Sequence, residues 1–381
     1  MDTLSFLGRT AWESFAEPAL TSTGLYEASD RTYGRSHIPF SPMEKRLHSN
    51  PNIEVWFGRA MLPNGKDWSW YQVWEDKEAQ RRTGRRADMI FVHGTGVHSG
   101  TLASHSRRYL DAGFRLIVPD LVSHGYSSGV HVYQRDLSAY TEGLHAVLHD
   151  VARRDDALEH HNEGTSTRRR PMKAERKPTF MLGLSFGGSV ALMYALDYPL
   201  SLREEPRGQD EIPIDGIIAV GPILGQHRAN VHIPLPLQWA IRGADRWLGA
   251  GRVEVLVPHR KILDKDPRVY KSLVTEDKRS HHGAFRVGHL LCIHEGMERL
   301  QAEAGKVRHP VYIQQGGQDR VACHEAAITW TRNISSEDKR MAVYPVCQHV
   351  IYRKAKTEEE DLAGRVACIE DNVDWICHRA P

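Results

Sequence analysis

One short stretch, residues 179–196, constrains the fold of this 381-residue chain more than any other. It begins with an apolar run at 180–182 that predicts a buried strand, and it ends with an Ala-, Leu- and Met-rich run that predicts a helix. The residues Gly-Leu-Ser-Phe-Gly lie between the two, so the backbone must turn sharply at Ser185. We therefore expect the Ser185 hydroxyl to be exposed at the tip of a strand, beside a helix N-terminus that favours negative charge.

The Gly-x-Ser-x-Gly pattern alone also fits a plain glycine-rich turn, because Gly and Ser are common in turns. The glycines at 183 and 187 would let neighbouring backbone approach closely in either case. The predicted strand before the pattern and the helix after it favour the more specific interpretation, a nucleophile elbow.

Strands and helices alternate along most of the remaining chain. The predicted strands are residues 88–92, 115–120, 215–222, 310–315 and 340–345, with residues 68–75 as an edge strand. The predicted helices are residues 104–112, 137–151, 189–196, 324–333 and 366–377, and residues 75–86 are expected to form a loop. This alternation predicts an α/β fold with a mostly parallel central sheet and helices on both faces.

Three segments depart from the alternation. Residues 225–305 predict a helical cap, or lid, inserted into a core formed by residues 1–224 and 306–381. Residues 1–50, with scattered prolines and many polar residues, predict an irregular N-terminal extension. Residues 153–177 are densely charged, and we expect a solvated surface insertion there, with a docking patch as the alternative.

Composition excludes several classes of protein. A hydrophobic content of 40% is enough for a large core, and a net charge of +2 gives no reason to expect a nucleic-acid partner. The five scattered cysteines include no Cys-x-x-Cys pair, so we expect neither a metal site nor a disulfide framework. We therefore expect a reducing, cytoplasmic location. We find no signal peptide and no apolar run long enough to span a bilayer.

Three side chains that suit acyl transfer follow three predicted strands. Ser185, Asp319 and His349 each lie just beyond the carboxyl end of a strand, and in parallel sheets these ends meet at one crevice. A serine hydroxyl becomes a good nucleophile only when a base takes its proton, which a histidine can do near neutral pH. An aspartate can orient that imidazole and stabilise its charged form. We therefore predict a catalytic triad of these three residues.

The same chemistry needs donors for the oxyanion of the tetrahedral intermediate. The backbone N–H groups of Phe186, after the nucleophile, and of Thr95, in the His-Gly-Thr-Gly turn, are the predicted donors. Asp120 and His124 are rival candidates for the acid and the base, although His124 precedes Ser185, which is the wrong order for this fold. His93 and His98 are expected to shape the turn.

The chain resembles the monoacylglycerol lipase-like, or serine aminopeptidase S33-like, branch of the α/β-hydrolase fold. The matching motifs are residues 93–100, 120–129, 183–188, 315–319 and 344–349. The resemblance implies an ester hydrolase with the triad and oxyanion donors named above. It also implies that Gly94, Gly96, His98 and Tyr352 contact the substrate.

The chain departs from the family pattern at several positions. Val97, Thr101 and Tyr352 replace a Glu, an Arg and a His that surround the glycerol headgroup in lipases of this branch, which argues against monoacylglycerol itself as the substrate. Ser123 replaces the glycine that usually precedes His124.

We therefore expect a serine hydrolase that uses no metal or cofactor and cleaves an ester of an apolar or acyl substrate. The alternatives with the same triad are an acyltransferase, a thioesterase, or a lactone or C–C bond hydrolase. A non-catalytic ligand-binding protein on the same fold is the alternative from another class. The Leu-, Ile- and Trp-rich segment at 235–248 is expected to pack on the core, with peripheral contact to a membrane as the alternative.

Overall fold

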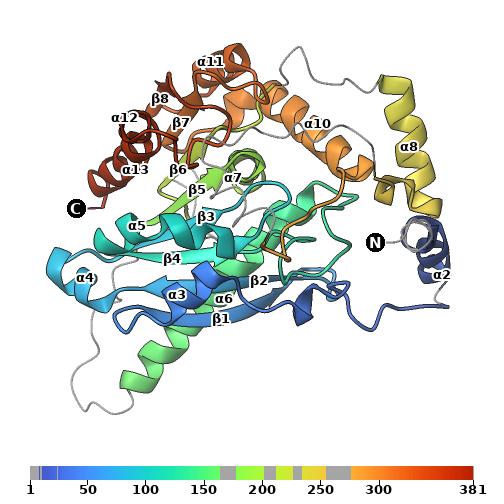
Figure 1. Cartoon of the computed structure of the whole chain (residues 1–381), viewed down its shortest axis with the longest axis horizontal. Coiled ribbons are helices and arrows are strands. Elements are labelled where there is room, and N and C mark those ends of the chain that lie inside the picture. The colour runs from blue at the N-terminus through green and yellow to red at the C-terminus, as the bar shows by residue number, and fades with distance from the viewer. Residues whose placement is uncertain are drawn as a thin grey trace.

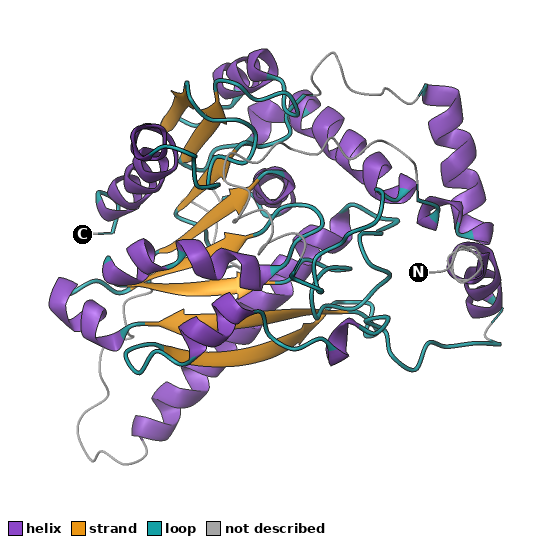
Figure 2. Ribbon diagram, viewed as in Figure 1, coloured by secondary structure: helices purple, strands orange, loops and turns teal. Residues whose placement is uncertain are grey.

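Eight strands form one sheet in the order β1-β2-β4-β3-β5-β6-β7-β8 (Figure 2). In this computed structural model, which describes residues 8, 11–23, 25–163, 177–200, 212–225, 234–254 and 276–380, β2 pairs antiparallel with β1 and β4, and the other pairs are parallel. The strands are β1 (Glu54–Met61), β2 (Trp68–Glu75), β3 (Ala87–Val92), β4 (Phe114–Pro119), β5 (Thr179–Leu184), β6 (Gly216–Val220), β7 (Val311–Gly316) and β8 (Lys339–Tyr344). The predicted α/β class and the mostly parallel sheet are confirmed.

Helices cover both faces of the sheet and enclose two apolar cores (Figure 1). One core is formed with α6 (Ser138–Glu163), α7 (Phe186–Asp197), α10 (Val287–Ala302) and α11 (His324–Asn333). The other is formed with α3 (Pro42–His48), α5 (Arg107–Asp111) and α13 (Ala367–Cys377). Because β3 to β7 are buried on both faces, their sequences are largely apolar, which is why they could be recognised.

The predicted edge position of residues 68–75 is wrong, because β1 lies outside β2. Gly58 and the charged Glu54 and Arg59 obscure the strand pattern of β1 in the sequence. The structure explains the glycine: a Cβ at Gly58 would lie 2.2 Å from the ring of Tyr71 on β2. The buried Tyr71 ring therefore requires a glycine in the neighbouring strand.

The predicted loop at 75–86 contains a short helix, α4 (Lys77–Thr83). Its N-cap residue, Asp76, accepts a hydrogen bond from the Ala79 N–H at 2.8 Å, and Gly84 ends it in the left-handed conformation. These are standard helix start and stop signals, and they were present in the sequence.

The N-terminal extension is also more regular than predicted. It contains the π-helix Trp12–Ala16, α2 (Glu17–Ser22) and α3. The prolines that suggested irregular structure, Pro18 and Pro42, lie in the first turns of α2 and α3, where a missing N–H costs nothing. Ser41 and Glu44 form a capping box at the start of α3.

The charged segment 153–177 begins as part of a helix. Helix α6 continues to Glu163 instead of ending near residue 151, and Arg153 and Arg154 form ion pairs with Asp150 one turn earlier. Residues 164–176 lie outside the described part of the chain, so the expected solvated insertion stays a prediction there.

Between β6 and β7 the described residues contain helices and no further strand of the sheet. This part contains α8 (Leu235–Leu248), a short 3-10 turn (Ala250–Arg252) and α10, while 226–233 and 255–275 lie outside the described residues. Helix α8 lies beside the N-terminal α2 (Figure 1), and Arg252 donates to Glu17 at 3.0 Å. The boundaries 225–305 of a separate cap stay a prediction. Among the described helices, none has an apolar stretch that could span a bilayer.

Several histidines are buried in the folded chain. Burial lowers the pKa of His93 and of His309 to about 4 and that of His289 to about 3, and it holds the pKa of His124 well below its usual value. All four side chains are almost inaccessible to solvent. They are therefore neutral in the folded protein under ordinary conditions.

These buried histidines predict a strong loss of stability in mild acid. Because the unfolded chain binds protons near pH 6.5 and the folded chain only near pH 4 or below, stability is complete above pH 6.5 and falls as the pH drops. Each histidine removes about 1.4 kcal/mol per pH unit, so four together could remove most of a typical folding free energy between pH 6.5 and 5. Thermal unfolding followed at pH 8, 7, 6 and 5 should show a steep drop in Tm below pH 6.5. A Tm that stays constant to pH 5 would contradict it.

Candidate active site

The turn between β5 and α7 places Ser185 at the edge of the sheet in a strained backbone conformation. Ser185 has φ 54° and ψ −123°, which L-residues rarely adopt. The flanking glycines make the turn possible, since a Cβ at Gly183 would lie 2.2 Å from the Gly187 carbonyl oxygen, and one at Gly187 would lie 2.3 Å from the His93 carbonyl oxygen. The strain and the close backbone contacts are those of a nucleophile elbow.

The structure brings Ser185, His349 and Asp319 together in one hydrogen-bonded chain. Ser185 Oγ lies 2.7 Å from His349 Nε2, and His349 Nδ1 lies 2.8 Å from Asp319 Oδ2. The three residues follow β5, β8 and β7, whose carboxyl ends meet at this edge of the sheet. Ser185 is partly exposed, whereas His349 is only 8% exposed. A base and its orienting carboxylate thus lie within hydrogen-bonding distance of a reachable hydroxyl.

The carboxylate of Asp319 is held by the loop that begins α11. One oxygen accepts the backbone N–H groups of Val321 at 2.7 Å and Ala322 at 3.0 Å. The other accepts Gln315 Nε2 at 2.8 Å in addition to the imidazole of His349. Donors around both oxygens fix the orientation of the carboxylate toward the imidazole.

The His-Gly-Thr-Gly turn after β3 lies against the nucleophile. A Cβ at Gly94 would lie 3.2 Å from Ser185 Cβ, and Gly96 has φ +74°. His93 fixes the start of the turn, because its Nε2 accepts the Leu121 N–H at 2.9 Å and its Nδ1 lies 2.8 Å from the Gly94 carbonyl oxygen. Thr95, the residue between the two glycines, is partly exposed.

Phe186 is the first residue of α7, and the first N–H groups of a helix have no partner within it. Its buried ring makes edge contacts with Tyr140 at 5.1 Å and with His289 at 4.9 Å between ring centroids. His289 in turn lies 3.1 Å from Thr95 Oγ1. The side chains of Phe186 and Thr95, whose backbone N–H groups are the predicted oxyanion donors, therefore both contact the buried imidazole of His289.

Two predicted substrate contacts have buried side chains. His98 is inaccessible to solvent, with Nε2 at 2.5 Å from Asp277 and Nδ1 accepting the Gly100 N–H. Tyr352 is 2% exposed, and its hydroxyl hydrogen-bonds Tyr109 and Asn372. In this conformation neither side chain presents a surface to a substrate; of the two turn glycines, Gly94 is buried and Gly96 is partly exposed.

The rival acid and base have other partners. The buried carboxylate of Asp120 accepts the N–H groups of Ser99 and Tyr126, both at 2.7 Å. It therefore ties the turn after β3 to the loop after β4. His124 is inaccessible, and its Nδ1 lies 3.1 Å from the Val122 carbonyl oxygen. These contacts indicate a structural role for both residues.

Three residues near the site were not identified from the sequence: His289, Tyr140 and Asp277. His289 and Tyr140 lie within helices, away from any strand end, and the chain has 22 histidines, so nothing local distinguished His289. Asp277 contacts the turn after β3 across 179 residues of sequence. Only long-range packing identifies such residues.

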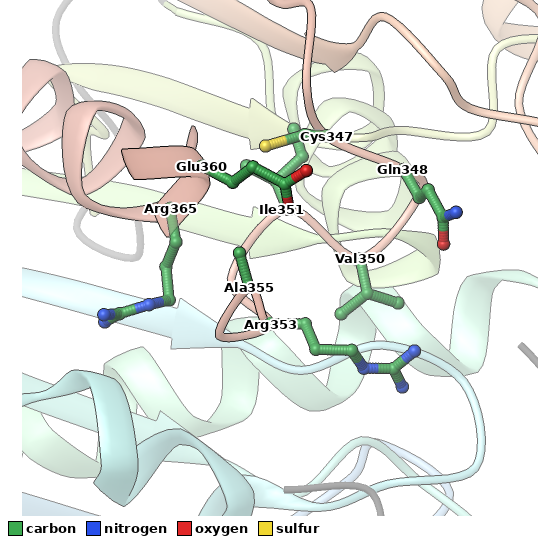
Figure 3. A pocket seen from close by; sticks show the side chains of 8 residues that line it. All are labelled: Cys347, Gln348, Val350, Ile351, Arg353, Ala355, Glu360 and Arg365. Carbon is green, nitrogen blue, oxygen red and sulfur yellow. The ribbon is translucent and has the colours of Figure 1, made fainter. Parts of the chain in front are cut away.

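The loop that carries His349 encloses a small cavity of about 20 Å³ (Figure 3). Its lining residues are Cys347, Gln348, Val350, Ile351, Arg353, Ala355, Glu360 and Arg365. The space suffices for about one water molecule, which is far too small for an acyl chain. Gly364 packs on the other side of this loop, where a Cβ would lie 2.5 Å from Cys347 Sγ. Close packing on the loop fixes the position of the imidazole.

Among the residues that the structure describes, no three His, Cys, Asp or Glu side chains are grouped so as to hold a metal ion. The adjacent His160 and His161 have side chains outside this set. Residues 226–233 and 255–275 of the predicted cap also lie outside the described part of the chain.

Comparison with known proteins identifies the family. The family described as "Serine aminopeptidase, S33" matches residues 83–355. The monoacylglycerol lipase of Mycolicibacterium smegmatis is 22% identical over 80% of this chain and 91% of its own length. The monoglyceride lipase of Homo sapiens is 23% identical over 71% of this chain and 78% of its own length.

Solved structures show the same fold. A soluble variant of monoglyceride lipase from Saccharomyces cerevisiae, in complex with a substrate analog, superposes with a TM-score of 0.64 at 17% identity and covers 87% of this chain and 97% of its own. The family match spans well over half of the chain and includes the elbow, the turn after β3, Asp319 and His349. This chain belongs to the serine aminopeptidase S33 family of the α/β-hydrolase fold, in its monoacylglycerol lipase-like branch.

Proposed function

We propose that this protein is a serine hydrolase that cleaves a carboxylic ester of an apolar, acyl-type substrate through an acyl-enzyme on Ser185. The observation that carries the proposal is the chain of hydrogen bonds from Ser185 through His349 to Asp319. The lipases and esterases among the relatives support a hydrolase of this type.

The proposed mechanism begins when His349 Nε2 takes the proton of the Ser185 hydroxyl as its oxygen attacks the ester carbonyl. Asp319 stabilises the imidazolium that forms. The backbone N–H groups of Phe186 and Thr95 stabilise the negative oxygen of the tetrahedral intermediate. His349 then gives its proton to the leaving alcohol, and an acyl-enzyme remains.

Water completes the cycle. His349 takes a proton from a water molecule, whose oxygen attacks the acyl carbonyl, and the carboxylic acid leaves as Ser185 regains its hydrogen. Every step uses side chains and backbone groups of this chain, so the proposal includes no cofactor. An acyltransferase would use the same groups with another acceptor in place of water. A thioesterase would use them with a thioester in place of the ester.

The alcohol part of the substrate is expected to differ from glycerol. Tyr352 and Thr101 stand where related lipases have headgroup residues, but the Tyr352 hydroxyl is hydrogen-bonded in the core and the Thr101 hydroxyl donates to the His98 carbonyl at 2.7 Å. Neither is available to bind a polyol. We therefore propose that the acyl part contributes most of the substrate binding.

Substitution of the triad tests the nucleophile. Wild-type protein should react with a fluorophosphonate probe, and Ser185→Ala should not react, because Ser185 is the residue whose hydroxyl lies 2.7 Å from the base His349. Asp319→Asn should lower kcat by about 10³- to 10⁴-fold, since the imidazole would lose its orientation. Ser335→Ala, which changes an exposed serine at the opposite end of β8, is the matched control. Labelling that persists in Ser185→Ala would show that Ser185 is not the nucleophile.

A panel of p-nitrophenyl esters tests the acyl preference. We expect kcat/KM to rise from acetate toward medium-chain esters, because apolar surface is buried when the acyl chain binds. Product analysis with an added alcohol measures hydrolysis against acyl transfer. A preference for acetate would contradict a site that binds a long acyl chain. New ester products in place of the free acid would show that the protein is an acyltransferase and not a hydrolase.

We also propose that α8 touches lipid surfaces. The sequence favoured burial of this segment, but Leu235, Leu237 and Trp239 are 52%, 51% and 68% exposed. Large apolar side chains exposed on one helix are suited to an interfacial position, where a substrate ester could be drawn from a membrane.

Vesicle sedimentation tests this contact. Wild-type protein should pellet with phosphatidylcholine vesicles, and Leu237→Ser/Trp239→Ser should lower the bound fraction several-fold. Leu158→Ser is the matched control, because Leu158 on α6 is 63% exposed and lies away from α8. Equal binding of all three proteins would contradict a role for α8.

A further inference from the structure

We infer that the hydroxyl of Thr95 is a third donor to the oxyanion, and that the buried His289 is the positioning residue that directs it. This inference rests on the proposed function and deepens it, because it assigns side chains to a site for which only backbone donors were expected. Three residues carry it: Thr95 in the turn after β3, His289 on α10 and Tyr140 on α6.

The position of Thr95 is the first observation. The preceding residue, Gly94, packs directly on Ser185, and the Thr95 side chain is partly exposed at the same edge of the sheet. Its Oγ1 lies 3.1 Å from His289 Nε2, and the His289 ring lies against the ring of Phe186, whose N–H is the other proposed donor. The hydroxyl of Thr95 and the ring of Phe186 therefore both contact the imidazole of His289.

The polarity of the hydrogen bonds follows from counting hydrogens. Tyr140 is buried, and its hydroxyl lies 3.0 Å from His289 Nδ1. If Nδ1 donated this bond, the buried hydrogen of Tyr140 would lose this acceptor, which is costly, so Tyr140 donates its hydrogen to His289 Nδ1.

This assignment fixes the tautomer of His289. With Nδ1 accepting from Tyr140, the hydrogen is on Nε2 and is donated to Thr95 Oγ1. The Thr95 oxygen is thus an acceptor in this bond, and its own hydrogen is free to be donated into the site. The opposite polarity would direct the Thr95 hydrogen at His289 and leave nothing for the oxyanion.

Burial keeps the relay in this state. His289 is inaccessible to solvent, and burial lowers its pKa to about 3, so the ring is neutral at every pH where the enzyme would work. Hydrogen bonds in such a dry environment polarise one another, which favours a single arrangement. A fixed donor costs no reorganisation when the oxyanion forms.

Paired substitutions at Thr95 provide the main test, with p-nitrophenyl butyrate as substrate. Thr95→Val keeps the shape and removes the hydroxyl, so kcat should fall about 10²- to 10³-fold with KM nearly unchanged, as for loss of one oxyanion donor. Thr95→Ser should restore kcat to within a few-fold of wild type. A Thr95→Val enzyme with wild-type kcat would overturn the inference, while loss of activity in Ser185→Ala would still support the proposed function.

A double variant tests the relay. His289→Phe should lower kcat in a wild-type background but have no further effect in Thr95→Val, because both remove the same donor. Additive losses in the double variant would overturn the role of His289.

Discussion

The strained turn at Ser185 is the constraint on which the rest of the site depends. Its φ of 54° is tolerated only because α7 starts immediately, its N–H donates to the Val220 carbonyl at 2.8 Å, and the neighbouring glycines let three chain segments touch. The same contacts place the turn after β3 against the hydroxyl. Strain at one residue is therefore compensated by packing around it, and that packing builds the proposed oxyanion site.

Buried polar groups connect the site to distant parts of the chain. Arg35, in the N-terminal extension, is 3% exposed and donates to the carbonyl oxygens of Gly125, Ser127 and Gly129. Arg279 and Glu44 form an ion pair with no exposed surface, between the segment before α10 and the capping box of α3. Since breaking one partner of such a pair is costly, the extension and the segment before α10 stabilise the loops around Ser185.

Local patterns predicted the core of this arrangement. The apolar strands and the glycines at 183 and 187 can be recognised in the sequence because each belongs to a pattern of consecutive residues. The convergence of Ser185, Asp319 and His349 followed from one further rule, that parallel strands end at one edge of a sheet. The capped helix α4 was also readable, from Asp76 and Gly84, but was assigned to a loop.

Other features depend on contacts that a single sequence does not display. The glycine in β1 is explained only by the ring of Tyr71 on the next strand. His98 and Tyr352 looked like substrate contacts by resemblance, yet partners 179 and 20 residues away keep them in the core. His289 has no local signal at all, because its importance arises from packing between α6, α7 and the turn after β3.

The central claim is that an acyl group resides on Ser185 during turnover, and intact-protein mass spectrometry tests it directly. Protein mixed with excess p-nitrophenyl butyrate and quenched in acid within milliseconds should carry one added butyryl group, located by peptide mapping to the segment that contains Ser185. The adduct should decay as free butyrate appears. An adduct on another residue, or turnover of the ester with no covalent adduct in a time course that resolves single turnovers, would contradict the account.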